Sequence, residues 1–108
     1  MQIAFETEAI RETCLKADVA QAKFGNVSAK SLFSAIADIR AASTAIDLFL
    51  AEETEDENGS HKLQVKFQGG GQLTLVSNHN RHNGPNAVRV NWSQVTRIRI
   101  LEISLDAR

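Results

Sequence analysis

The sequence predicts an α+β domain in which an N-terminal strand and a helical hairpin pack on one face of a mostly antiparallel sheet of about four strands. Three observations lead to this prediction. Apolar residues recur every three or four positions between residues 10 and 39, as they do along one face of a helix. Apolar and polar residues alternate over residues 61–76 around three consecutive glycines, which is typical of a β-hairpin. Residues 95–103 are rich in β-branched side chains and contain neither Gly nor Pro, as expected for a central strand.

The N-terminal part of the chain predicts one strand and two helices. Residues 2–5 alternate polar and apolar side chains, which indicates a short first strand. Thr7 is suited to cap a helix that ends near Gly25, where glycine can adopt a positive φ. Asn26 is suited to cap a second helix, whose apolar stripe consists of Leu32, Ala35, Ile36 and Ile39. The two helices then form the predicted hairpin.

Two features follow the second helix. Ser43 and Thr44 can cap a short helix from Ala45 to about Leu50, in which Ile46 is too apolar to be expected at the surface. Residues 52–59 contain five acidic side chains and no apolar one, so they predict a solvated acidic loop rather than an interaction or metal site.

The last strand has an informative alternation. Thr96, Ile98 and Ile100 share one face, and Arg97 and Arg99 share the other. After Ile100 the apolar residues change sides. Such a change indicates either a β-bulge or a strand that enters a region buried on both faces.

Composition places the chain among ordinary globular proteins. Residues 1–108 form one predicted domain with 43% hydrophobic residues. The single cysteine, Cys14, excludes an internal disulfide and is expected to be a buried structural thiol. The N-terminus lacks the pattern of a signal peptide and no stretch has the ~20 apolar residues of a membrane span, so a cytoplasmic protein without membrane contact is expected. No metal or other cofactor is predicted, because no acidic or sulfur ligand accompanies the three histidines.

Charge is distributed unevenly along the chain. Residues 1–58 carry 11 acidic and 5 basic side chains, and residues 59–108 carry 2 and 7. The predicted strands carry basic residues on their outward positions, and the loop between the last two strands adds more; these residues are Lys62, Lys66, Arg97, Arg99, His79, Arg81 and His82. A basic surface without acidic neighbours binds phosphate in nucleic-acid-binding proteins, but it is also common as plain solvated surface. Chemistry alone leaves both interpretations open.

Three stretches are similar to motifs of one protein family. Residues 37–42 (ADIRAA) resemble the helix ending L-A-D-[LI]-R-A-A, and residues 70–79 (GGQLTLVSNH) resemble G-Y-R-L-x-F-x-P-N-H. Residues 91–103 (NWSQVTRIRILEI) are similar to D-W-S-x-V-T-x-I-x-I-L-x-I. These are motifs of the RelE/HigB/ParE toxin superfamily of type II toxin–antitoxin modules, in particular of the killer proteins of plasmid maintenance. The predicted element order resembles that family over nearly the whole chain.

The resemblance implies a small toxin that a cognate helix-turn-helix antitoxin neutralises, either as a single copy or as a homodimer. Most relatives enter the ribosomal A site and cleave mRNA by transferring the phosphate to the neighbouring 2′-oxygen, and a gyrase-directed branch shares the fold without that chemistry. Carried over to this sequence, the catalytic candidates are His79, Arg81 and Arg99. The RNA-binding candidates are Lys62, Lys66, Arg97 and Arg108.

The sequence departs from the family where catalysis is expected. The family's Tyr-Arg pair after the hairpin turn is Gly71-Gln72, and the chain contains no Tyr. Residues 105–108 lack the Tyr or His found near the C-terminus of relatives. His79 remains either a proton carrier or the donor or acceptor of a loop-capping hydrogen bond. An active endoribonuclease, a non-cleaving or gyrase-directed relative and a plain protein-interaction module are therefore the three functional hypotheses.

Overall fold

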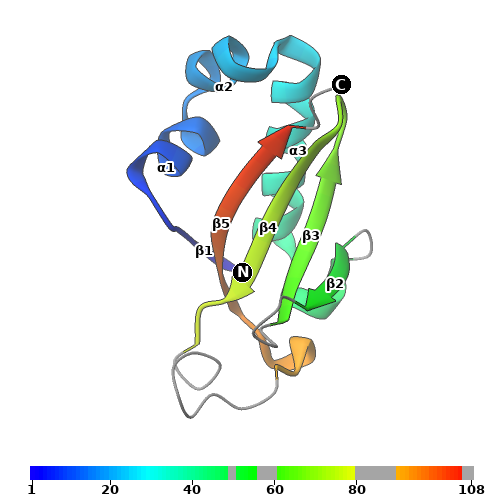
Figure 1. The fold of residues 1–108 in the computed structure, drawn as a ribbon. Coiled ribbons are helices and arrows are strands. Elements are labelled where there is room, and N and C mark those ends of the chain that lie inside the picture. Colours follow the sequence, from blue (N-terminus) through cyan, green and yellow to red (C-terminus); the bar gives the residue numbers. More distant parts are fainter. Residues whose placement is uncertain (49–50, 56–60, 80–89, 106–108) are drawn as a thin grey trace.

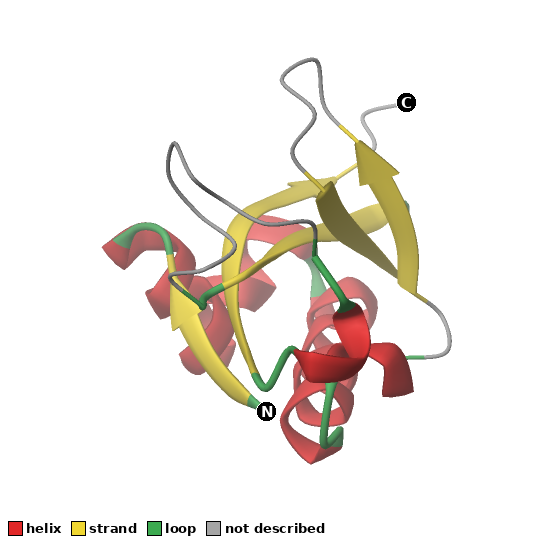
Figure 2. Cartoon of the chain, turned by 90° about the horizontal axis from the view of Figure 1, so that it is seen from below, coloured by secondary structure: helices red, strands yellow, loops and turns green. Residues whose placement is uncertain are grey.

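The computed structural model describes residues 1–48, 51–55, 61–79 and 90–105. The helices are α1 (Glu8–Leu15), α2 (Ala17–Phe24) and α3 (Asn26–Ala41), with two short 3-10 turns, η1 (Ala45–Asp47) and η3 (Trp92–Gln94). The strands are β1 (Gln2–Phe5), β2 (Ala51–Glu55), β3 (His61–Phe67), β4 (Gly71–Ser77) and β5 (Arg97–Leu105). They form one twisted sheet in the order β1-β5-β4-β3-β2, in which β1 is parallel to β5 and the other pairs are antiparallel. The helices lie on one face of this sheet (Figures 1 and 2). The predicted α+β class is thus confirmed.

The sheet has a fifth strand where the sequence predicted an acidic loop. Ala51–Glu55 pairs with β3 as an edge strand, and residues 56–60 lie outside the described part of the chain. Charged side chains are tolerated on an edge strand because one side of it remains in solvent. Glu53 also gains a partner on β3, since its Oε1 lies 2.9 Å from Nδ1 of His61. Glu52 and Glu53 are exposed, as predicted, but the backbone of residues 52–55 forms a strand and not the predicted loop.

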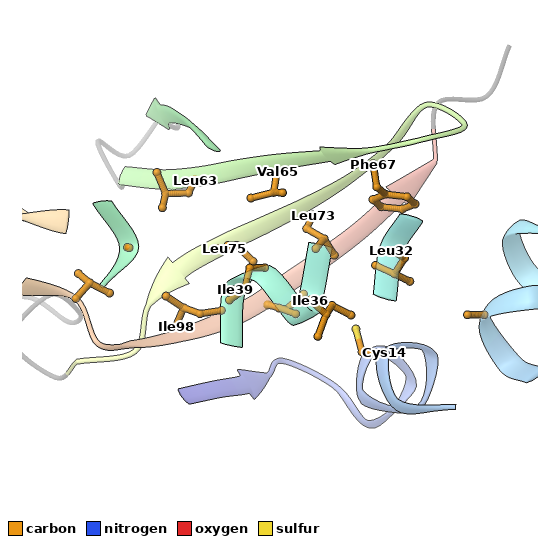
Figure 3. Packing of buried hydrophobic residues seen from close by; sticks show 14 of the residues in the cluster. Cys14, Leu32, Ile36, Ile39, Leu63, Val65, Phe67, Leu73, Leu75 and Ile98 are labelled. Atoms are coloured by element: carbon orange, nitrogen blue, oxygen red, sulfur yellow. The ribbon is translucent and has the colours of Figure 1, made fainter. Parts of the chain in front are cut away.

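The core lies between α3 and the central strands (Figure 3). Leu32, Ile36 and Ile39 of α3 are at most 4% exposed and face apolar residues of β3, β4 and β5. The facing strand residues are Leu63, Val65, Phe67, Leu73, Leu75 and Ile98. Three of the four residues of the predicted stripe are therefore confirmed at the centre of the core, whereas Ala35 is only half-buried. Trp92, in η3, belongs to the same buried cluster and anchors the chain before β5.

The first predicted helix is divided into α1 and α2 at Lys16, whose φ of −116° and ψ of 114° are extended. Thr7 caps α1 as predicted, because its Oγ1 accepts a hydrogen bond from the N–H of Ile10 (3.1 Å). The break lets α1 bury Cys14, while α2 turns to pack along α3 and buries Ala20 completely. One straight helix could not direct both residues into the core.

Two details around α3 differ from the prediction. Asn26 does not cap the helix; it is the first helical residue, and Gly25, with φ of 83°, occupies the cap position without a side-chain hydrogen bond. The predicted helix from Ala45 to Leu50 is only the single turn η1 among the described residues. Ile46 is 61% exposed, because the inward position of that turn is filled by Ala45, whose N–H donates to the carbonyl of Val95 (3.0 Å).

A β-bulge explains the change of sides in β5. Leu75 pairs with Ile100 and Thr74 pairs with Glu102, so Leu101 has no partner in the ladder. The extra residue returns Ile103 to the core side, opposite Leu73. The first of the two alternatives read from the sequence is therefore correct.

Within the described residues, no helix combines the length and apolar character needed to cross a lipid bilayer.

Candidate functional site

The face of the sheet opposite α3, called here the outer face, carries the candidate site. On β5 the buried Ile98 and Ile100 alternate with Arg97 and Arg99, which places both arginines on the outer face. Their Cα atoms lie roughly 7 Å apart, the spacing of two residues along a strand. Sequence alternation predicted this placement, and the structure confirms it.

Lys62 joins these arginines from β3. It precedes Leu63, which pairs with Leu75, and the next residue of β4, Val76, pairs with Arg99. Lys62 therefore lies two strands away from Arg99, or about 10 Å, with Val76 between them. Lys62, Arg97 and Arg99 are called the cation cluster below.

Lys66 lies apart from the cation cluster. It pairs with Gln72, four residues along β3 from Lys62 and thus about 13 Å away. A row with a carboxylate at each end crosses the sheet between them; its members are Glu52, Gln64, Thr74 and Glu102. The expectation of a basic surface without acidic neighbours is wrong at this row, because acids distant in the sequence become neighbours through strand pairing.

Glu6 is a site residue that sequence reasoning missed. Ile3 and Phe5 pair with the core residues of β5, so Ala4 and Glu6 lie on the outer face beside Arg99. Oε1 of Glu6 is 3.7 Å from Nε of Arg99. The parity of residues 2–6 could have placed Glu6 on this face, but the parallel pairing of β1 with β5 that brings it to Arg99 could not be read from the sequence.

His79 lies beside the cation cluster, at the end of β4. The main-chain N–H of Thr96 donates to its Nε2 (3.0 Å), and Nη2 of Arg97 lies 3.1 Å from its Nδ1. Both neighbours are donors, and a neutral imidazole accepts at only one nitrogen. When Nε2 accepts from Thr96, Nδ1 carries the ring proton and cannot accept from Arg97, so the approach of Arg97 is a close contact and not a second hydrogen bond. The loop-capping hydrogen bond of His79 is therefore observed.

Two other candidates, Arg81 and Arg108, lie outside the described residues, as does His82. The described residues hold no group of three or more His, Cys, Asp or Glu side chains arranged to bind a metal ion.

Gly71, which stands where the motif that residues 70–79 resemble has a tyrosine, has no room for a side chain. A Cβ atom added there would overlap the ring of Phe67, its neighbour across the β3–β4 pair. Gln72, by contrast, lies on the outer face. Glycine at this position is therefore a packing requirement of the turn.

Cys14 is 2% exposed on the core side of α1. Burial raises the pKa of its thiol to about 11, with Arg40 acting weakly in the opposite direction. A thiol that remains protonated at neutral pH is a poor nucleophile, so its structural role is as predicted.

A groove of about 580 Å³ runs between α3, η1 and the edge of the sheet. It exists because β2 pairs only with the first five residues of β3, leaving the edge at Lys66 and Phe67 uncovered. Ser31, Ala35 and Asp38 of α3 form one wall, and Leu48 and Ala51 form part of the other.

No protein-family model, curated protein or solved structure matches this chain. What the fold establishes is a small α+β domain with three helices and a mixed five-stranded sheet.

Proposed function

We propose that this chain is a toxin, or a toxin-like relative, of a type II toxin–antitoxin module, and that it acts in the cytoplasm on ribosome-bound mRNA. It binds the RNA backbone through the cation cluster and cleaves RNA slowly or not at all. The cluster is the observation that carries the proposal: Lys62, Arg97 and Arg99 converge on one face of a rigid sheet from strands about 35 residues apart. The motif resemblance over residues 37–42, 70–79 and 91–103 supplies the class of target.

RNA phosphate suits this surface physically. Three cations within about 12 Å of one another, with Glu6 the one carboxylate found within 4 Å of Arg99 among the described residues, favour a polyanion. The guanidinium groups can each donate two parallel hydrogen bonds to a phosphate. Binding of this kind weakens steeply as salt is raised, because bound phosphates release counterions.

Weak cleavage follows from the groups around the cluster. Phosphate transfer to a 2′-oxygen needs groups that remove and supply protons, which typically contribute ~10²–10⁴-fold. Nε2 of His79, the histidine beside the cluster, already accepts a hydrogen bond from the N–H of Thr96. The chain has no Tyr that could replace it. Induced expression of the unaltered chain is therefore expected to give weak or no growth arrest.

The direct test is RNA binding by purified variants that each lose one positive charge. Arg97→Gln and Arg99→Gln are expected to weaken binding of a short single-stranded RNA roughly three- to tenfold, measured by fluorescence anisotropy at low salt. Lys66→Gln is the matched control, because Lys66 lies on the same face beyond the acidic row. Absence of RNA binding by the unaltered chain, or equal losses at all three positions, would contradict the proposal.

A second candidate function, protein interaction, is favoured by the groove beside α3. Its walls combine apolar residues with Asp38 and Lys66, which suits a peptide segment of a partner such as the proposed helix-turn-helix antitoxin. Ala35→Arg would fill this groove and leave the outer face intact. If the chain is purely an interaction module, this variant abolishes partner binding, while Arg97→Gln and Arg99→Gln leave partner binding unchanged.

A further inference from the structure

The contact between Arg99 and Glu6 leaves one strong donor unsatisfied. Nε of Arg99 is shielded from solvent and makes no hydrogen bond among the described residues, although a third of the side chain is exposed. The Glu6 carboxylate is 3.7 Å away, close enough for attraction between charges but too far for a hydrogen bond. A shielded donor without an acceptor is costly, so an oxygen that reached Nε would be favoured.

The neighbouring strands supply no such oxygen from their side chains. Arg99 is flanked by Ala4 on β1 and by Val76 on β4. Ala4 is small enough for the arginine to lean over β1 toward Glu6. The main chain of Glu6 is fixed, because its N–H donates to the carbonyl of Ile100 (2.9 Å), but its side chain is 46% exposed and has solvent available on one side.

We propose that the Glu6 carboxylate competes with RNA phosphate for the guanidinium of Arg99. The carboxylate faces the guanidinium when RNA is absent and turns to solvent when a phosphate oxygen accepts from Nε–H. The phosphate displaces it because a short charge-assisted hydrogen bond replaces a long ionic contact. This inference rests on the proposed RNA-binding function and names the residue that limits the affinity of the site.

The test compares two glutamates of the same segment. Glu6→Gln removes the competing charge, and Glu8→Gln removes an equal charge two residues further, where the carboxylate faces Arg11 (3.4 Å). Binding of a fluorescent single-stranded RNA at low salt is expected to be about two- to fivefold tighter for Glu6→Gln than for Glu8→Gln. This difference should shrink as ionic strength rises, since exposed charges are screened by salt.

A second background shows whether Glu6 acts through Arg99. In Arg99→Gln, the advantage of Glu6→Gln over Glu8→Gln should disappear. Persistence of that advantage, or equal affinities of the two single variants, would overturn the inference and leave the proposed function standing.

Failure of the proposed function gives a different pattern. If only Glu6→Gln binds RNA and the unaltered chain does not, the competition is supported while the function of the unaltered chain is refuted. If neither protein binds RNA, both ideas fall.

Discussion

The central strands carry mainly apolar residues on the face that packs on α3, with Ser77 as a buried polar exception, whereas the outer face carries charges of both signs in separate rows. On the inner face, Leu73 and Leu75 of β4 lie opposite Ile103 and Ile100 of β5. On the outer face, neighbouring residues of the same two strands form the pairs Thr74–Glu102 and Val76–Arg99. Burial selects mainly apolar side chains on the inner face. The chemistry of the outer face depends instead on which residues the strand register brings next to one another.

The largest expected effect is a one-residue deletion that breaks the register of the inner face. Without Thr74, β4 cannot keep both Leu73 and Leu75 in the core, so the chain is expected to lose cooperative thermal unfolding. Deletion of Leu101 is the counterpart, because removing the bulge leaves Ile100, Glu102 and Ile103 with their present partners in a regular ladder. It should cost less than about 2 kcal/mol. Similar damage from both deletions would show that the bulge itself is required.

A smaller loss is expected where one core side chain is shortened. Ile39 is fully buried between α3 and the sheet, and Ile39→Ala should lower the free energy of unfolding by ~2–5 kcal/mol in denaturant titrations. Ile46→Ala removes the same atoms from a 61% exposed side chain and should cost under about 0.5 kcal/mol. Equal losses of stability in the two variants would show that α3 does not pack against the inner face of the sheet.

Cys14, which α1 buries in the core, makes the stability of the fold sensitive to high pH. Its pKa is raised by burial from 9.0 to about 11, so between these values the folded state keeps a proton that the unfolded state has lost. Stability therefore falls as pH rises from about 9 to 11, by about 2–3 kcal/mol in all. Denaturant titrations at pH 8.5 and 10.5 measure this loss. Cys14→Ala is the control, and an identical fall in that variant would assign the effect to other groups.

The same contrast between the faces explains what could be predicted from the sequence. Alternation along β3, β4 and β5 and the spacing in α3 were sufficient to predict the core, because burial makes side chains of one kind recur at a fixed period. The bulge at Leu101 changes that period locally. A sequence with such a change also fits a strand buried on both faces, so the bulge was one of two alternatives. Strand β2 was missed, because an edge strand needs no apolar alternation.

The candidate site was predicted only in part. Arg97 and Arg99 were placed correctly from alternation within one strand. The acidic row and the approach of Glu6 depend on pairings between different segments of the chain. Alternation within one strand says nothing about such pairings. The engagement of His79 depends likewise on how the chain returns from β4 to β5.

The smallest expected effect is on RNA affinity, when one positive charge is added at different places on the outer face. Val76 lies between Lys62 and Arg99, so Val76→Arg would extend the cation cluster, whereas Gln72→Arg adds the same charge beside Lys66, beyond the acidic row. A fourth cation in the cluster should tighten RNA binding about two- to threefold at low salt, and the same charge at position 72 should have less than half that effect. The gain at position 76 is limited because like charges on adjacent strands repel, and this repulsion should appear as a small loss of thermal stability without RNA. Anisotropy titrations of both variants at two salt concentrations measure the difference. If Gln72→Arg improved binding as much as Val76→Arg, RNA would be responding to the net charge of the protein, and the separation of the outer face into rows would have no part in binding.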